Sequence, residues 1–309
     1  MTAHGTVVVI GGPTASGKTH AAAALGQQLG TEVISADSRQ FYHAMRIGTA
    51  RPKEEELLGV QHHFLGHLEL EQVWSAGAFA RAAETVLQDL LKEHGIAVLV
   101  GGSGLYIDAL IKGLDPLPAG DPVWRERIQQ RFSNEGLAPL LKELEALDPV
   151  CWQQIDRRNP HRVIRALEVC HATGRPYSSQ RNGAHDRTDL RIVRIWMDLP
   201  REALYARIDQ RVDQMIAARL AEEARSLLPY REHNALRTVG YRELFEHFDR
   251  PSPPLPPQEG ITLAQAITSI KQHTRNYAKR QLTWSRRDPW YKCGPLEHEK
   301  HIQLANAAS

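Results

Sequence analysis

The chain has 309 residues, of which 24% are charged and 42% hydrophobic, and its formal net charge is +2. This composition is typical of a globular protein and excludes a disordered chain. No apolar run approaches the roughly 18 residues that a membrane helix needs, so we expect no transmembrane segment. Cys151, Cys170 and Cys293 lie far apart and form no CxxC pair. We therefore expect neither a disulfide framework nor a zinc site, as is usual for a cytoplasmic protein.

The first predicted element is a strand at residues 6–11, which runs into a glycine-rich loop. Residues 12–19 read Gly-Pro-Thr-Ala-Ser-Gly-Lys-Thr, and an alanine-rich helix is predicted at 17–29. This order is the phosphate-binding loop pattern. The glycines let backbone N–H groups turn toward an anion, and the helix N-terminus adds positive potential. In this pattern Lys18 contacts phosphate oxygens, and the Thr19 hydroxyl holds Mg²⁺.

A carboxylate follows the second predicted strand, at residues 32–36, in the form of Asp37. Ligands of open parallel sheets bind at the carboxyl ends of the strands, so Asp37 should face the phosphate loop. The strand predicted at 96–101 is followed by Gly-Ser-Gly and has no carboxylate there, unlike the strand that holds Mg²⁺ in most nucleotide hydrolases. Asp37 is either an N-cap or a residue that holds Mg²⁺ through water, or else a general base acting on an acceptor.

Further along the chain, predicted helices and strands alternate at first, and helices then predominate. We predict helices at 75–94 and 103–112, a strand at 191–197, and long helices at 201–228 and 261–287, the last two separated by a proline-rich linker at 251–257. The predicted fold class is α/β: a P-loop-containing parallel sheet core with crossover helices, plus a mostly helical insertion domain. Residues 1–112 and 190–309 form the core, and residues 113–189 form the insertion.

Basic residues gather in three segments although the net charge is small. Residues 271–287 hold lysines and arginines, no acidic residue, and the aromatic Tyr277 and Trp284. Further clusters lie at 157–165 and 237–242. Clustered cations with interleaved aromatics are typical of RNA-binding surfaces, where they contact phosphates and stack on bases. The alternative for each cluster is a solvated helix face, with the aromatics packed inward.

Eight sequence blocks follow one another in a specific order. They are GPTASGKT at 12–19, SADSRQ at 35–40, IGTARP at 47–52, HHF at 62–64, VGGSGLY at 100–106, RVIRALEV at 162–169, VGY at 239–241 and YAKRQLTW at 277–284. In this order, over nearly the whole chain, they resemble the bacterial tRNA dimethylallyltransferases, also called isopentenyl-diphosphate:tRNA transferases. That family usually has threonine where Ser103 stands, so the hydroxyl is kept.

The resemblance implies a reaction. A dimethylallyl group would move from dimethylallyl diphosphate to the exocyclic N6 amine of the adenosine immediately 3′ of the anticodon in tRNA, releasing diphosphate. The phosphate loop would then hold a leaving group, and no attacking water would be needed. The implied partners are the tRNA anticodon stem-loop and dimethylallyl diphosphate, with Mg²⁺ as cofactor. We expect no membrane association, and a monomer without an obligate protein partner.

The resemblance also implies roles for individual residues. Asp37 would be the base, with Ser103 and Lys18 as further catalytic residues and Thr19 as the metal ligand. The diphosphate site would comprise Gly12, Pro13, Thr14, Ala15, Ser16, Gly17, Lys18, Thr19 and Arg211. The tRNA-binding residues would be Asp37, Ser38, Arg39, Gln40, Ser103, Arg125, His161, Arg162, Val163, Ile164, Arg165, Arg237, Gly240, Tyr241, Arg242, Arg275, Lys279 and Arg280.

Three other functions stay open on the sequence. A prenyltransferase of free adenine nucleotides would use the same loop, but it does not need the insertion or the basic C-terminal helix. A small-molecule kinase would use Asp37 as base for a hydroxyl acceptor. A non-catalytic RNA-binding protein would retain tRNA without group transfer.

Overall fold

The computed structural model describes residues 5–115, 117–118, 120–181, 187–249, 261–294, 297, 300–301 and 303–304. It divides into two compact units, residues 1–111 with 186–309 and residues 112–185. The linker predicted at 251–257 lies outside the described residues. No helix within the described ranges has both the length and the hydropathy that a membrane span requires.

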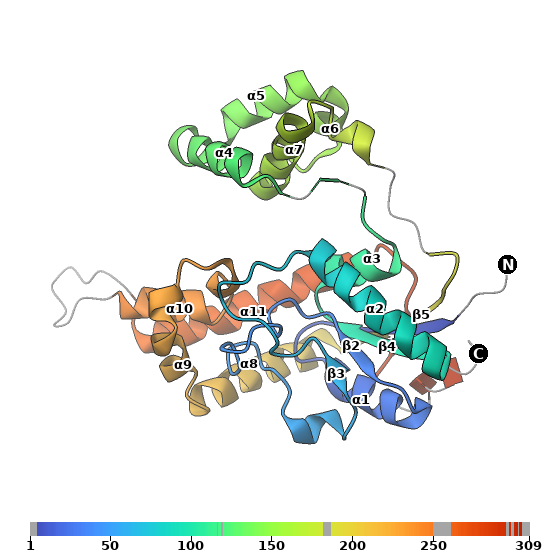
Figure 1. The fold of residues 1–309 in the computed structure, drawn as a ribbon. Coiled ribbons are helices and arrows are strands. Elements are labelled where there is room, and N and C mark those ends of the chain that lie inside the picture. Colours follow the sequence, from blue (N-terminus) through green and yellow to red (C-terminus); the bar gives the residue numbers. More distant parts are fainter. Residues whose placement is uncertain are drawn as a thin grey trace. The chain divides into compact units, whose positions relative to one another are not determined.

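The larger unit is built on a six-stranded parallel sheet with the strand order β3-β2-β4-β1-β5-β6 (Figure 1). The strands are β1 (Thr6–Gly11), β2 (Val33–Ser35), β3 (His62–His63), β4 (Ile96–Gly101), β5 (Arg191–Met197) and β6 (Tyr291–Cys293). The central strands β1 and β4 read as continuous apolar runs because both of their faces are covered. The predicted fold class is thereby confirmed. The edge strands β3 and β6 were not predicted, because two or three residues carry no recognisable period.

Helices pack on both faces of this sheet. Helix α1 (Lys18–Leu29) covers one face, and helices α2 (Ala76–His94) and α3 (Gly104–Ile111) cover the other. The unit also contains α8 (Arg201–Ala217), α9 (Leu220–Ser226), α10 (Tyr241–Phe248) and α11 (Leu263–Ser285), which pack against one another. Side chains alternate along β1, so that Val7 and Val9 join the core formed with α2 and α3, whereas Val8 and Ile10 join the core beneath α1. The helix predicted at 201–228 is interrupted near Arg219, which has a φ of 73°.

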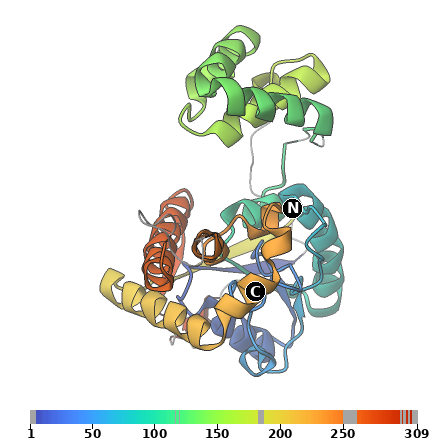
Figure 2. The ribbon, with the colours of Figure 1, turned by 90° about the vertical axis from the view of Figure 1, so that its left-hand side faces the viewer.

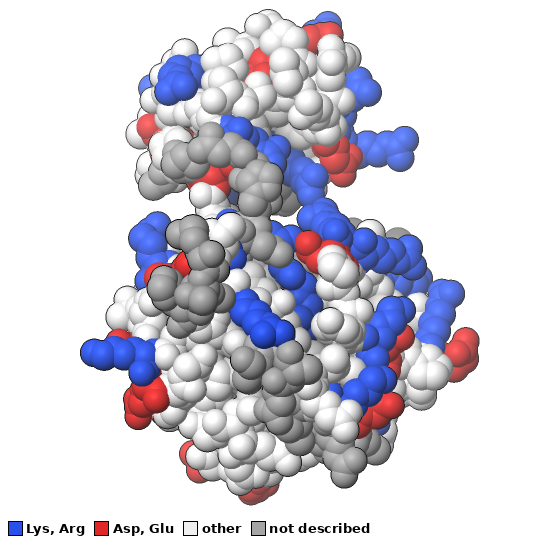
Figure 3. Space-filling view, turned by 90° about the vertical axis from the view of Figure 1, so that its right-hand side faces the viewer, with Lys and Arg blue, Asp and Glu red and all other residues white. Residues whose placement is uncertain are grey.

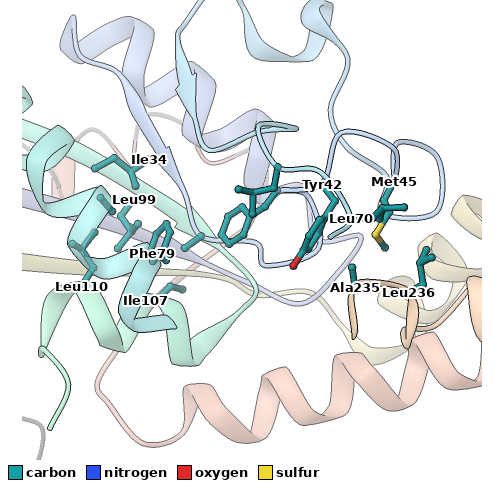
Figure 4. Packing of buried hydrophobic residues seen from close by; sticks show 14 of the residues in the cluster. Ile34, Tyr42, Met45, Leu70, Phe79, Leu99, Ile107, Leu110, Ala235 and Leu236 are labelled. Atoms are coloured by element: carbon teal, nitrogen blue, oxygen red, sulfur yellow. The ribbon is translucent and has the colours of Figure 1, made fainter. Parts of the chain in front are cut away.

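One hydrophobic core links the sheet to the loops that carry the candidate site. In Figure 4, Ile34, Leu99 and Phe79 lie near the sheet, and Met45 and Leu236 lie at the far end of the same cluster. Helices α8 and α11 are neighbours (Figure 2), with Leu204 and Ile208 packed against Ala278. The loops at this end are therefore anchored by buried apolar contacts.

The smaller unit is helical, and it lies between α3 and β5 in the sequence. Its helices are α4 (Pro122–Glu135), α5 (Leu137–Leu147), α6 (Pro149–Gln154) and α7 (Pro160–Thr173). Ile128, Leu140, Leu144 and Leu167 belong to its core. The buried Asp148 carboxylate accepts hydrogen bonds from the backbone N–H groups of Cys151 and Ser178 and from the Ser178 hydroxyl, which fixes the start of α6. The unit thus has a core of its own.

Candidate active site

The loop between β1 and α1 has the backbone that the glycine pattern predicts. Gly17 has a φ of 89° and Ala15 has a φ of 64°. A Cβ at Gly12 would lie 2.5 Å from the Ser16 Oγ and 2.9 Å from the Met197 Cβ, so only glycine fits there. Among the described residues, the buried Ser16 hydroxyl has no hydrogen-bond partner. A tight loop with left-handed turns and an unpartnered polar atom suits an anion.

Two cations stand beside this loop. Lys18 is 9% exposed, and burial lowers its pKa to about 8, although the Asp37 carboxylate opposes that shift and the Arg211 guanidinium adds to it. Burial also lowers the pKa of Arg211, against the opposing effect of Asp37 and Glu56. Arg211 remains charged, since guanidinium groups do not lose their proton in proteins. Positive charge is therefore held here at a desolvation cost, which a bound anion would relieve.

A glutamine on α11 ties the loop to the neighbouring strand end. The Thr14 backbone N–H donates to the Gln281 Oε1 at 2.9 Å, and the Gln281 Nε2 donates to the Gly102 carbonyl at 2.9 Å. Gln281 is 5% exposed. One buried amide thus connects the segments after β1 and after β4 with the long C-terminal helix.

Asp37 lies in the turn after β2, beside a network of hydroxyl groups. The Ser103 Oγ is 3.1 Å from both the Ser38 N–H nitrogen and the Ser38 Oγ. Tyr277 of α11 is also hydrogen-bonded to Ser103, and burial, reinforced by the Asp37 charge, raises the pKa of Tyr277 to about 12. The Arg39 N–H donates to the Asp37 Oδ1 at 3.3 Å. Asp37 is therefore held at the carboxyl edge of the sheet and caps no α-helix.

Two hollows meet at Asp37. The smaller, of about 270 Å³, is lined by Lys18, Thr19 and Glu56. The larger, of about 450 Å³, is lined by Tyr277 and by segments of α8, α11 and the loop before α10. Both hollows are lined by Thr14, Ala15, Asp37, Thr49, Ala50 and Arg211. We call the smaller one the phosphate pocket and the larger one the acceptor pocket.

The acceptor pocket is strongly basic. Its lining holds the side chains of Arg39, Arg211, Arg237, Arg242 and Arg280, against Asp37 as the one carboxylate among the described lining residues, and His273 lines it too. The Arg280 guanidinium lies 5.5 Å from the Tyr277 ring centroid. Basic side chains also occur on the face shown in Figure 3, where Asp and Glu lie beside several of them. The acceptor pocket differs from this surface because several arginines surround one hollow.

Glu223 of α9 holds the loop that both pockets share. Its carboxylate accepts hydrogen bonds from the N–H groups of Arg46, Ile47 and Gly48, and from the Tyr241 hydroxyl at 2.7 Å. A Cβ at Gly48 would lie within 2.5 Å of the Tyr241 ring. The IGTARP block is thus shaped by a carboxylate on another helix.

The structure does not gather all the predicted RNA-binding residues at a surface. Tyr241 is fully buried, so its side chain supports the acceptor pocket from behind. Val163 and Ile164 belong to the core of the helical unit because they lie on the apolar face of α7. Arg165 pairs with the buried Glu168 at 3.2 Å. The side chains of Tyr241, Val163 and Ile164 therefore have structural roles, whereas the role of Arg165 toward RNA stays a prediction.

Other predicted residues remain accessible. Arg125, His161 and Arg162 are exposed on the helical unit, and Lys279 and Arg280 are exposed on α11. In contrast, Arg275 of α11 makes two hydrogen bonds of 2.8 and 2.9 Å to the Asp209 carboxylate. The Trp284 indole donates to Asp108 and packs near Trp196 and Trp290, so it is part of the core and does not stack on bases.

Four residues that shape or line the candidate site were not predicted from the sequence: Gln281, Glu223, Glu243 and His273. Gln281 lies within the YAKRQLTW block, which was the one local signal for it. Glu223, Glu243 and His273 act through partners that are distant in sequence, so a single chain without its fold carries no signal for them.

A phosphate loop with buried cations that adjoins a basic pocket is typical of an enzyme that binds a polyphosphate beside a second, anionic ligand. The model of the family described as IPP transferase matches residues 40–288. The chain belongs to this IPP transferase family.

Named relatives agree with this assignment. The chain is 45% identical over 295 residues to the tRNA dimethylallyltransferase of Christiangramia forsetii, covering 94% of each chain. It is 42% identical to the tRNA dimethylallyltransferase of Cytophaga hutchinsonii, covering 94% of this chain and 93% of that one. The solved full-length tRNA isopentenylpyrophosphate transferase of Bacillus halodurans is 33% identical, with a TM-score of 0.68 and coverage of 98% of this chain and 95% of that one.

The pKa of Lys18 generates a prediction about anion binding. Because burial lowers this pKa to about 8, Lys18 is charged below pH 8 and loses its charge as the pH rises through that value. The affinity of the wild type for inorganic diphosphate, divided by that of Lys18→Met, should fall as the pH rises past 8. Isothermal titration calorimetry on both sides of pH 8 measures this ratio. A ratio that stays constant with pH would contradict the assignment of Lys18 to the phosphate pocket.

Proposed function

We propose that this chain transfers a dimethylallyl group from dimethylallyl diphosphate to the N6 amine of the adenosine immediately 3′ of the anticodon in tRNA, and that it does so in the cytoplasm. The observation that carries the proposal is the meeting of the phosphate and acceptor pockets at Asp37. A donor held by its diphosphate in one pocket would present its allylic carbon to a nucleophile in the other.

The phosphate pocket would stabilise the leaving group. As the allylic C–O bond breaks, negative charge grows on the diphosphate, next to Lys18, Arg211 and the backbone N–H groups of the loop. Fixed charges in a dehydrated site stabilise such a transition state strongly. Both cations are there before the substrate binds, so little reorganisation is required.

The phosphate pocket also fits a magnesium ion. Mg²⁺ takes oxygen ligands and is commonly held by one or two protein groups together with phosphate oxygens and water. The Thr19 hydroxyl lines the pocket, and the Glu56 carboxylate lines it too. Thr19 would be the protein ligand, and the ion would neutralise part of the diphosphate charge. Within the described ranges, no cluster of three acidic, histidine or cysteine side chains offers a protein-only site.

The acceptor side would supply the base. The N6 nitrogen forms a bond to the allylic carbon, the C–O bond to diphosphate breaks, and one N6 proton passes to the Asp37 carboxylate. Ser103, itself held by Ser38 and Tyr277, would hydrogen-bond the same amine and fix its direction. An adenine amine is a poor nucleophile, so orientation would contribute much of the rate.

The nucleic acid would be held by its phosphates. Arg237, Arg242 and Arg280 line the acceptor pocket, and Lys279 is exposed next to Arg280 on α11. The target base would leave the stack of the anticodon loop to enter the pocket, as in other enzymes that modify bases. Exposed Arg125, His161 and Arg162 would extend the contact on the helical unit.

A transfer assay tests the proposal against its alternatives. Radiolabelled dimethylallyl diphosphate is offered with an anticodon stem-loop RNA or with AMP, and [γ-³²P]ATP is offered in parallel reactions. We expect label in the RNA alone, with no requirement for ATP. Label in AMP would indicate a free-nucleotide prenyltransferase, and ³²P transfer to an acceptor a kinase. RNA retention without any label transfer would indicate a non-catalytic RNA-binding protein.

The assignment of Asp37 predicts the effect of Asp37→Asn, which keeps the shape and removes the charge. The kcat for prenyl transfer should fall by roughly 10²–10⁴-fold, the range for loss of a general base. Stem-loop affinity should stay within about twofold, since a single exchange of one oxygen for nitrogen removes no phosphate contact. Steady-state kinetics and filter binding measure the two quantities. Asp89→Asn, at an exposed position on α2, is the control, and turnover of Asp37→Asn equal to that of the control would rule out the role.

The exposed pair Lys279 and Arg280 predicts the salt dependence of RNA binding. Replacing both by alanine should weaken stem-loop binding and reduce the slope of log K against log salt by about 0.7–0.9 for each phosphate that the protein no longer neutralises. Diphosphate affinity should not change, because neither residue lines the phosphate pocket. The matched control replaces the exposed Arg81 and Lys92 of α2 by alanine. A slope equal to that of the control would show that this pair does not bind RNA.

A further inference from the structure

A histidine on α11 is held in one orientation at the wall of the acceptor pocket. The side chain of His273 is 41% exposed and lines the pocket. Its Nδ1 donates a hydrogen bond of 2.6 Å to the Glu243 Oε1. Nothing in the reaction described above uses this ring.

The carboxylate that holds the ring is itself fixed. Glu243 of α10 is 1% exposed. Its Oε2 accepts the Gly240 N–H at 2.8 Å, and the Arg242 guanidinium lies 3.5 Å from its Oε1. A buried carboxylate with these contacts cannot move without leaving donors unpaired. Because Nδ1 is engaged by this carboxylate, Nε2 is the ring nitrogen that remains for a ligand.

The helix spacing places this nitrogen relative to the reacting groups. His273, Tyr277 and Gln281 are four residues apart, so they share one face of α11. Each step is about 6 Å along the helix axis. Gln281 binds the phosphate loop and Tyr277 stands by Ser103 and Asp37, so His273 lies one turn farther from the diphosphate. In adenosine the ribose is attached at the end of the base opposite the N6 amine. A base whose amine reaches Asp37 therefore directs its ribose toward this part of the pocket.

We propose that His273 is a specificity-determining residue whose Nε2 hydrogen-bonds a ribose 2′-hydroxyl of the acceptor RNA, at the modified adenosine or at a nucleotide beside it. This inference rests on the proposed function. A hydroxyl both donates and accepts, so it pairs with Nε2 in either protonation state of the ring, whereas a phosphate pairs only with the protonated ring. Phosphates already have arginines to bind in this pocket. The 2′-hydroxyl is the group by which a protein distinguishes RNA from DNA.

The test uses anticodon stem-loops that carry one 2′-deoxy nucleotide, either at the acceptor adenosine or at one of its two neighbours. With the wild type, one of these substitutions should raise KM about 3- to 10-fold, the effect of removing one hydrogen bond, with little change in kcat. With His273→Ala, the same deoxy substitution should have no further effect on KM.

A second variant separates RNA contact from structural support. In His273→Asn, the amide nitrogen takes about the place of Nδ1 and keeps the bond to Glu243, but no group replaces Nε2. The inference predicts that His273→Asn loses sensitivity to the deoxy substitution just as His273→Ala does. Diphosphate affinity should match the wild type in both variants.

Two results would overturn the inference: a wild type that is indifferent to all three deoxy substitutions, or a His273→Asn variant that keeps the wild-type deoxy penalty. The latter would give His273 a structural role toward Glu243. Transfer of label to the all-RNA stem-loop by the wild type is scored separately. Its absence would reject the proposed function itself, not this contact.

Discussion

The candidate site depends on one buried amide. Gln281 accepts the Thr14 N–H and donates to the Gly102 carbonyl, and so fixes α11 against the ends of two central strands. The loops after β1 and β4 are separated from Gln281 by 267 and 179 residues, yet these two hydrogen bonds set their distance from one helix. Once α11 is fixed here, the residues one and two turns earlier must face the acceptor pocket. The same helix therefore lines the acceptor pocket and, through Gln281, holds Thr14 of the loop that lines both pockets.

The electrostatics of the site follow from the burial of its charged side chains. Lys18 and Arg211 lie next to Asp37 in surroundings that lower the pKa of both cations. Such burial costs free energy in the empty enzyme, and an anionic ligand returns it on binding. The acceptor pocket also gathers cations, but its arginines are mostly exposed, so they can bind phosphates and release counterions. The Asp37 carboxylate lines both pockets, which is where the proposed reaction needs a proton acceptor.

Features that are local in sequence were predictable. The phosphate loop combines its glycines, Lys18 and Thr19 within eight residues, and Asp37 follows a buried strand directly, so both could be placed at the sheet edge before the fold was known. The parallel sheet and the helical character of the insertion followed from hydrophobic periodicity. The edge strands β3 and β6 were too short to show a period.

Features that depend on tertiary pairing were not predictable. Tyr241 lies in the VGY block between Arg237 and Arg242 and is nevertheless buried, with its hydroxyl donating a hydrogen bond to Glu223. His273 and Glu243 are 30 residues apart and meet only when α10 and α11 pack. Arg165 and Arg275 belong to basic clusters, yet each is paired with a carboxylate inside its own unit. Charge clustering thus named Arg237, Arg242 and Arg280, which line the acceptor pocket, but could not separate them from the paired Arg165 and Arg275.

The central claim is that α11, through Gln281, joins the two pockets into one site, and Gln281→Leu tests it most directly. The matched control is Gln272→Leu, an exposed glutamine earlier on the same helix. Affinity for inorganic diphosphate and the rate of prenyl transfer to stem-loop RNA are measured for both variants. The account predicts at least a tenfold loss in both quantities for Gln281→Leu, since the Thr14 N–H and the buried Gly102 carbonyl lose their partner and the loop is released. Values for Gln281→Leu that equal those of the control would contradict it.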